Sequence, residues 1–127
     1  MIEKKFLLKA EERIKTAQWA LENKLLNSAV SNCYYALFNA MQAVIGKPPS
    51  GKWEHGGIAK FFCKKVNESS EFSPLKPFLK KFPKFTAELY SLRKVADYEG
   101  YLDQEIEEEI RMFVKRTKEL IIHINTL

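Results

Sequence analysis

Cysteines and long apolar runs are both scarce in this sequence. Its two cysteines, Cys33 and Cys63, each lie in an apolar periodic stretch, and neither belongs to a Cys-x-x-Cys pair. This usage predicts buried free thiols and argues against a disulfide framework. No apolar run approaches the roughly 20 residues that a membrane-spanning helix needs, and the N-terminal segment is charged and amphipathic, unlike a signal peptide. We therefore expect a cytoplasmic protein that does not associate with a membrane.

Familiar catalytic and cofactor-binding motifs are missing as well. The sequence has no Gly-x-Gly-x-x-Gly, no phosphate-cradling Gly-Lys-Ser/Thr loop, no His-Glu-x-x-His and no Gly-x-Ser-x-Gly. His55 and His123 are the only histidines, and they fall on different predicted helices with no ligand at metal-binding spacing. We expect neither a metal site nor a cofactor.

The apolar content is enough for one folded unit. Of the 127 residues, 46% are hydrophobic and 13% are aromatic. These values suit one compact domain that spans residues 1–127 and has a substantial core.

Charge is distributed unevenly around the net value of +5. Residues 47–84 carry nine lysines against Glu54, Glu68 and Glu71, an excess of six positive charges, whereas residues 97–109 carry seven acids and no base. A basic segment can attract phosphates or nucleic acid, and an acidic stretch can meet a basic partner or a second copy of the chain. The alternative is that both segments are ordinary solvated faces.

Apolar residues recur at steps of three and four along most of the chain, which is the period of an amphipathic helix. No segment shows the alternation of a strand. The pattern predicts an all-α, up-and-down bundle of four long helices plus a short additional helix. The predicted helices cover 4–23, 26–45, 54–66 (the short one), 74–98 with an interruption at Pro83, and a last segment that follows Asp103.

Glycine and charge mark two of the helix boundaries. Gly46 ends the second helix, and its neighbours indicate a loop over residues 46–53. Asp103 is the expected N-cap of the last helix, because acids crowd the first turns of that helix and bases lie toward its end.

Prolines complicate the middle of the chain. Residues 67–72 are predicted to be a polar linker, and Ser73 to be the N-cap that precedes Pro74 at the first helical position. Pro83 should break the following helix, because proline cannot supply a helix-interior N–H. This leaves a short piece near 74–81 and a main piece near 84–98.

The second predicted helix is apolar nearly all round and should be the most buried element. Tyr34 lies on its apolar stripe and is expected in the core. One polar stripe remains, formed by Asn32, Tyr35, Asn39 and Gln42 at steps of three and four. This stripe could receive another helix or a ligand, or could simply face solvent at a crevice.

A second polar stripe runs beside the core face of the helix near 84–98. Its members are Thr86, Tyr90, Arg93 and Asp97. One interpretation is an intrahelical pair of Arg93 and Asp97, worth about 0.2–0.5 kcal/mol. The other is a phosphate-binding arginine, with Asp97 fixing its orientation and Tyr98 capping or stacking.

Three short motifs together resemble the HEPN domain family, and in particular its small stand-alone prokaryotic branch. The likeness spans about residues 5 to 125. The motifs are Ser31-x-x-Tyr34-Tyr35-Ala36-x-Phe38, Glu54-His55-x-x-Ile58 and Arg93-x-x-Ala96-Asp97-Tyr98.

The resemblance implies a homodimeric helical bundle and a partner. Many small members pair with a minimal nucleotidyltransferase, often as a toxin and antitoxin. The ribonucleases of the family use an arginine that a histidine follows after four to six intervening residues. Arg93 matches that arginine, but the corresponding positions hold Tyr98, Glu99 and Gly100. The histidine is missing, and a tyrosine with an ordinary pKa of about 10 cannot replace it unaided near neutral pH.

These observations favour a binding protein that is the partner of a minimal nucleotidyltransferase and binds nucleotide or RNA. One alternative is a metal-independent homodimeric ribonuclease, in which Arg93 acts with His55 if folding brings them together, or with Asp97 or Tyr98. A third is a purely structural helical interaction module. The predicted binding residues are Arg93, Asp97, Tyr98, Tyr35, Asn39 and His55.

Overall fold

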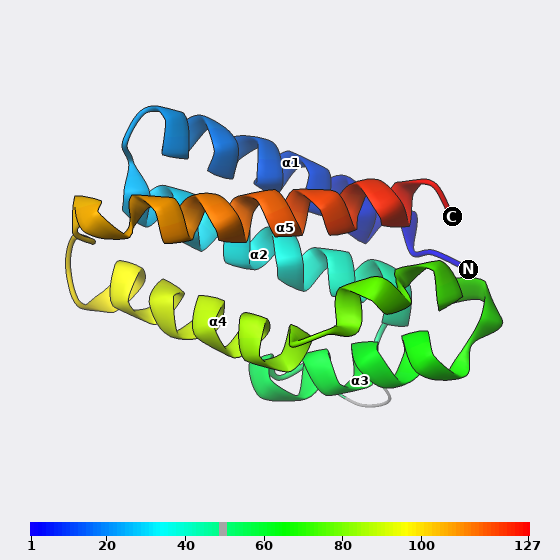
Figure 1. Ribbon diagram of the computed structural model, residues 1–127. Helices are drawn as coiled ribbons and strands as arrows, with labels where there is room; N and C mark the ends of the chain where they lie inside the picture. The colour runs from blue at the N-terminus through cyan, green and yellow to red at the C-terminus, as the bar shows by residue number, and fades with distance from the viewer. Residues whose placement is uncertain (49–50) are drawn as a thin grey trace.

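The computed structural model describes residues 1–48 and 51–127, and every regular element in these ranges is helical (Figure 1). Residues 49 and 50 of the predicted loop lie outside the described residues. The elements are α1 (Lys4–Glu22), α2 (Leu26–Ile45), α3 (His55–Glu68), η1 (Ser70–Leu79), α4 (Phe82–Tyr98), η2 (Gln104–Ile106) and α5 (Glu107–Asn125), where η1 and η2 are 3-10 helices. The predicted all-α class is confirmed.

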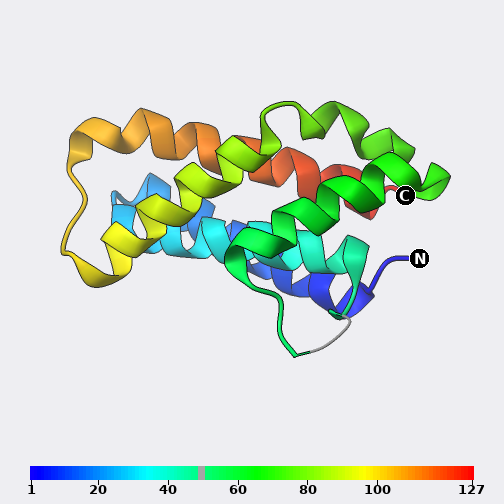
Figure 2. The same ribbon diagram turned by 90° about the horizontal axis from the view of Figure 1, so that it is seen from below.

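The long helices α1, α2, α4 and α5 run side by side along the molecule, and α3 and η1 pack at the end where both termini lie (Figures 1 and 2). The second helix, α2, is central, as predicted, because it packs against α1, α3, α4 and α5. Eleven of its residues are buried, including Cys33, Tyr34 and Leu37. Its nearly uniform apolar surface explains this position, since a helix with an apolar surface all round is stable only when neighbours cover it.

The segment between α3 and α4 differs from the prediction. Residues 67–72 are not a polar linker, because α3 continues to Glu68 and η1 begins at Ser70. Phe72 is fully buried in the core, which gives this segment an apolar anchor. The prediction that Ser73 is an N-cap is also wrong, since Ser73 lies inside η1. Pro74 and Pro77 both lie in η1, and their missing N–H groups disfavour a regular α-helix there.

The start of α4 is set by a backbone turn. Lys81 has φ 58°, a left-handed conformation that redirects the chain immediately before Phe82. The predicted division of this segment near Pro83 is confirmed, since η1 ends at Leu79 and α4 begins at Phe82. Pro83 itself lies in the first turn of α4, where its missing N–H costs nothing. At the start of the last helical segment, Asp103 accepts a hydrogen bond from the backbone N–H of Glu105 (3.0 Å). This agrees with the predicted cap, although the first turn is the 3-10 helix η2 and α5 begins at Glu107.

The two cysteines differ in burial, and this difference predicts how fast each thiol reacts. Cys33 is fully buried, its thiol lies 3.6 Å from Thr117 Oγ1, and burial raises its pKa to about 12. Cys63 is half-buried, and burial raises its pKa as well. Because the thiolate is the reactive form, Ellman's reagent should label Cys63 slowly and Cys33 only after unfolding. A Cys63→Ser variant should show one reactive thiol in guanidinium and none in native buffer. Rapid labelling of that variant in native buffer would contradict the prediction.

Within the described residues, no helix is both long enough and apolar enough to span a membrane.

Candidate functional site

Arg93 lies at the centre of a cluster between α2 and α4. It is only 5% exposed, and its Nη1 donates two hydrogen bonds, to Tyr35 Oη (3.1 Å) and to Asp97 Oδ2 (2.9 Å). Arg93 and Asp97 meet because they are four residues apart on α4, whereas Tyr35 comes from α2. The predicted intrahelical pair is therefore present, and it is part of a larger arrangement.

Asp97 is also held from α2. Ser31 Oγ donates a hydrogen bond to Asp97 Oδ1, so both carboxylate oxygens have partners. Ser31 and Tyr35 are one helical turn apart and face α4 together. The orientation of the Arg93 side chain thus depends on the spacing between α2 and α4.

Three tyrosine rings surround the guanidinium group. The central carbon of Arg93 lies 5.2 Å from the ring centroids of Tyr34 and Tyr90, and 5.5 Å from that of Tyr35. Such contacts favour a desolvated cation. Burial opposes the charge, but Tyr35 and Asp97 favour it more strongly, and the pKa of Arg93 is raised above its ordinary value. The cluster is built around a permanent positive charge.

One N–H group of this buried cation has no acceptor. Both hydrogen bonds of Arg93 come from Nη1, and its buried Nε lacks a partner among the described residues. Leaving a buried donor unsatisfied costs about 1–3 kcal/mol, and such groups are rare in native proteins. An oxygen of a ligand or a partner could remove this cost.

His55, the first residue of α3, belongs to the same cluster. Its Nδ1 is hydrogen-bonded to Tyr34 Oη, and its ring stacks on Tyr90 with the centroids 4.8 Å apart and the planes 19° apart. Tyr34 and Tyr90 therefore contact both His55 and Arg93. Folding thus brings His55 and Arg93 into the same cluster within one chain. Burial raises the pKa of the Tyr34 hydroxyl, which stays protonated at neutral pH.

The protonation of His55 should be visible in the stability of the fold. Burial, and then the charge of Arg93, lower the pKa of His55 from its ordinary 6.5. The folded state therefore favours neutral His55, so its contribution to stability is present above the unfolded pKa and is lost as pH falls through the folded pKa. Between about pH 7 and pH 5, the free energy of unfolding should fall more for wild type than for His55→Gln. Parallel urea-denaturation curves against pH for the two proteins would contradict this expectation.

A pocket of about 300 Å³ opens beside His55, between α3 and α4. His55 and Tyr90 form one wall, and the exposed Lys60 lies at its edge. The remaining lining residues are small or apolar: Gly56, Ala59, Pro83, Thr86 and Ala87. The space suits a flat ring, with a cation nearby for an anionic substituent.

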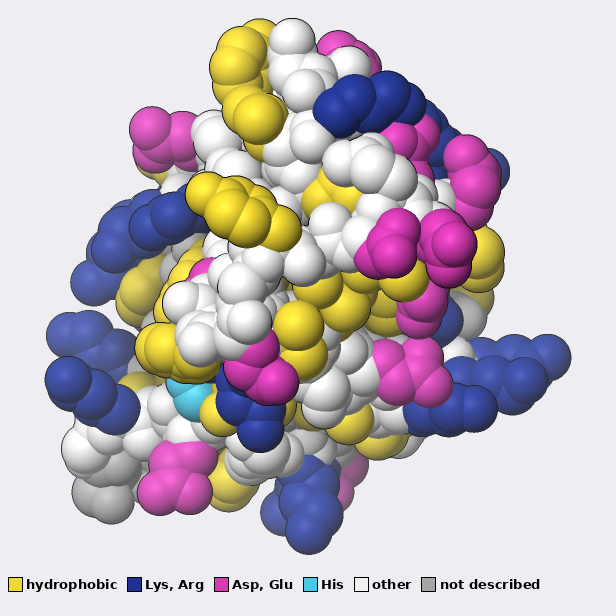
Figure 3. Space-filling view, turned by 90° about the vertical axis from the view of Figure 1, so that its left-hand side faces the viewer, with side chains coloured by type: hydrophobic (Ala, Val, Ile, Leu, Met, Phe, Trp, Pro, Cys, Tyr) yellow, Lys and Arg dark blue, Asp and Glu magenta, His cyan; other side chains and the backbone are white. Residues whose placement is uncertain are grey.

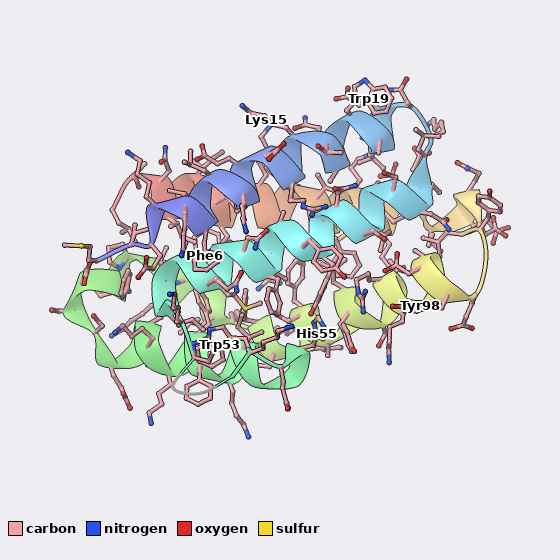
Figure 4. The ribbon with its side chains drawn as sticks, turned by 180° about the vertical axis from the view of Figure 1, so that it is seen from behind. Phe6, Lys15, Trp19, Trp53, His55 and Tyr98 are labelled. Atoms are coloured by element: carbon pink, nitrogen blue, oxygen red, sulfur yellow. The ribbon has the colours of Figure 1, made fainter. Side chains whose placement is uncertain are left out.

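Two predicted site residues lie at the edge of the cluster or outside it. Tyr98 is 76% exposed near the end of α4, away from His55 (Figure 4), and it forms the rim of the site, where its hydroxyl helps to raise the pKa of Arg93. Asn39 donates its side-chain hydrogen bond to Gln42 Oε1 (2.9 Å) along α2, not to Arg93 or Asp97. Asn39 follows the period of the polar stripe, but it lies one helical turn beyond Tyr35, the residue of α2 that contacts Arg93.

Asn27 supports the site, and the prediction did not include it. Its Nδ2 donates to the carbonyl oxygens of Ala96 (2.8 Å) and Gly100 (2.7 Å), and its Oδ1 accepts from Leu102 N–H (2.8 Å). Asn27 precedes Ser31 by one helical turn, and that step of four continues to Tyr35. The sequence therefore carried a signal for this stripe, but only the fold shows what it contacts.

Around this end of the molecule, acidic and basic side chains lie among exposed hydrophobic groups (Figure 3).

Arg13 was also missed. Its guanidinium carbon lies 5.5 Å from the Tyr35 ring, and its Nη1 donates to Asn32 Oδ1 (3.3 Å). Two arginines, one exposed and one buried, therefore contact the same tyrosine. The sequence around Arg13 has no motif that distinguishes it from a solvated charge on α1.

Comparisons with known proteins match nearly the whole chain. The family model of the HEPN domain matches residues 3–125. The "Putative toxin MJ0605" of Methanocaldococcus jannaschii is 31% identical over 120 residues, which cover 91% of this chain and 85% of that protein. The "Putative toxin MJ0142" of the same organism is 25% identical over 129 residues (97% and 84%), and a "UPF0332 protein" of Thermotoga maritima is 28% identical over 119 residues (94% and 85%). No solved structure matches the chain.

Proposed function

The chain belongs to the HEPN domain family, and on that basis we propose that it is a toxin-type member whose Arg93 cluster binds the phosphate of a nucleotide or RNA in the cytoplasm. The names of two relatives support a toxin-like role. The observation that carries the binding proposal is the buried, permanently charged Arg93 with an Nε that has no partner among the described residues.

Phosphate is the acceptor that this arrangement suits. A guanidinium group binds a phosphate through two parallel N–H groups, and Asp97 and Tyr35 already fix the other side of Arg93 through Nη1. His55 and Tyr90 then offer a stacked aromatic wall for a base in the adjoining pocket. Tyr98, on the rim, is free to contact either the ligand or a partner.

We also propose that the protein is a homodimer and that its partner is a minimal nucleotidyltransferase. The acidic stretch of residues 97–109 begins within the Arg93 cluster, and four of its acids form no ion pair with a described residue, so they offer negative charge to a basic partner: Glu99, Asp103, Glu105 and Glu109. The purified chain, mixed with a nucleotidyltransferase encoded beside it, should form a complex that is stable in size-exclusion chromatography with light scattering. Nucleotides or short RNA should raise its melting temperature. The absence of both a complex and a ligand-dependent shift would refute the proposal.

A second candidate function, metal-independent RNA cleavage, is favoured by the position of His55. When Nδ1 carries the proton and donates to Tyr34, Nε2 is free to accept a proton from a ribose 2′-hydroxyl. The 2′-oxygen would attack the phosphorus held by Arg93, the bond to the 5′-oxygen would break, and the leaving oxygen would take a proton from water or from a group of a second subunit.

Cleavage can be tested in the presence of a chelator. Wild type should degrade RNA, whereas His55→Gln and Arg93→Lys should lose at least about 100-fold in rate, the usual contribution of a general base. Asn39→Ala, a polar change on the same helix as Tyr35, should keep full activity. An active His55→Gln variant would exclude His55 as the base and leave the binding proposal unaffected.

A further inference from the structure

The outer face of α3 combines lysines with two aromatic rings, the exposed Phe61 and the partly buried Trp53. Phe61, Lys64 and Lys65 are exposed and share one side of the helix through steps of three and four. Trp53, from the preceding loop, packs on Phe61 with the ring centroids 4.9 Å apart. Lys47 lines the same shallow pocket of about 260 Å³. We call Lys47, Trp53, Phe61, Lys64 and Lys65 the basic-aromatic face.

Apart from Trp53, which is partly buried against the core, this face is not packed into the fold. The apolar side of α3 is already buried through Ile58, Phe62 and Val66, whereas Phe61 remains 46% exposed. The Trp53 indole N–H donates to Gly46 O (2.7 Å), which fixes the ring beside Phe61. The aromatic pair is therefore held in place at the surface.

The positive charge of the face is not neutralised within the chain. Lys47, Lys64 and Lys65 form no ion pair with any residue that the structure describes. Glu68, four residues after Lys64 and a lining residue of the same pocket, forms no ion pair with Lys64 either. The face lies within the basic segment 47–84, so its unpaired positive charge is available to an anionic ligand.

We propose that the basic-aromatic face binds single-stranded RNA. Lysines attract successive phosphates, and an exposed aromatic ring offers a surface on which an unpaired base can stack. Insertion into a lipid surface fits poorly, because Phe61 is the one large apolar side chain that α3 exposes, and Ile58, Phe62 and Val66 are buried in the core. This function goes beyond the phosphate site at Arg93 and does not depend on it. The two surfaces do adjoin, since only Glu54 separates Trp53 from His55 (Figure 4).

Trp53 can report on binding directly. The chain has two tryptophans, and Trp19 is 59% exposed on α1. In a Trp19→Phe variant, an oligouridine of about twelve nucleotides should quench the remaining fluorescence as bases stack near the indole. In the matched Trp53→Phe variant, the same oligonucleotide should leave Trp19 fluorescence unchanged.

Affinity should depend on the lysines and on Phe61 separately. Lys64→Glu/Lys65→Glu should weaken binding by at least about tenfold and reduce the slope of log affinity against log salt by about 1.4, or about 0.7 for each lost phosphate contact. Phe61→Ala should cost about tenfold without changing that slope. Lys15→Glu/Lys115→Glu, with the same charge change on α1 and α5, should have little effect.

Three results would overturn the proposal. They are no quenching of Trp53, equal affinities for the two double lysine variants, and binding of polyglutamate or anionic vesicles in preference to oligouridine. Arg93→Lys distinguishes this face from the Arg93 cluster, because that variant should still show quenching of Trp53 by oligouridine. If this variant loses nucleotide binding but keeps the quenching, the two surfaces bind their ligands independently. If it keeps nucleotide binding, the function proposed for Arg93 fails while the proposal for this face stands.

Discussion

Replacing Arg93 by alanine should abolish nucleotide or RNA phosphate binding at the cluster and lower the free energy of unfolding by about 2 kcal/mol. The substitution removes both hydrogen bonds of Nη1 and leaves Asp97 and Tyr35 without their cation. Breaking a fully buried ion pair costs about 3–5 kcal/mol, but the Asp97 side chain is 26% exposed and water can partly replace the guanidinium. Urea denaturation and nucleotide titration followed by calorimetry would measure the two effects.

Two further variants separate binding from folding. Arg93→Lys keeps the charge but loses the planar fork, so it should recover part of the stability and little of the binding. Arg111→Ala removes an arginine from a comparable pair on α5, with Glu107 four residues away, but at an exposed position. Its effect should be about 0.5 kcal/mol or less, with binding unchanged. If Arg93→Ala lost stability but kept the nucleotide affinity of wild type, the cluster would be purely structural.

The second large effect is expected at Asn27. Asn27→Ala removes three hydrogen bonds between α2 and the end of α4 with its following loop. Each such bond contributes about 1 kcal/mol, so the free energy of unfolding should fall by about 2–3 kcal/mol. Urea denaturation would measure this loss. The ligand affinity of the cluster should fall less than in Arg93→Ala, because Arg93 and the other residues proposed to contact phosphate are all still present.

Controls can show that the donors of Asn27 matter. Asn27→Asp keeps an acceptor for Leu102 N–H but places a negative charge against the carbonyl oxygens of Ala96 and Gly100, so it should be less stable than Asn27→Ala. Asn67→Ala, at an exposed position near the end of α3, should change stability by about 0.5 kcal/mol or less. Equal stabilities of Asn27→Ala and Asn67→Ala would show that the Asn27 bridge contributes nothing.

The regular helices could be predicted because their apolar period is strong. The predicted 4–23 and 26–45 agree with α1 and α2 to within one residue. The segment around η1 could not, since the apolar stripe continues through it while its prolines and Phe72 favour a local geometry that periodicity does not describe. The polar residues of 67–72 suggested a linker, but a single buried phenylalanine fixes the path of this segment.

The site divides in the same way into local and tertiary parts. The step of four predicted the Arg93–Asp97 pair, and the motifs predicted the family, which is confirmed. The contacts of Ser31, Asn27 and His55 depend on how α2, α3 and α4 pack, and one sequence carries no direct signal for packing. Asn39 shows the opposite error, because it follows the period of the polar stripe but lies too far along α2 to contact Arg93 or Asp97, and it bonds to Gln42 instead.

The bridges between α2 and α4 also set an order of assembly for the chain. Tyr35 and Arg93 are 58 residues apart, and Ser31 and Asp97 are 66 apart, whereas α1 and α2 are neighbours joined by a short turn. Distant segments meet only after a larger loss of chain entropy, so we expect the α1–α2 hairpin to form early and the Arg93 cluster to close late. A nascent chain whose α4 has not yet left the ribosome would then carry a folded hairpin but no Arg93 cluster, so the cluster would form only when synthesis is nearly complete.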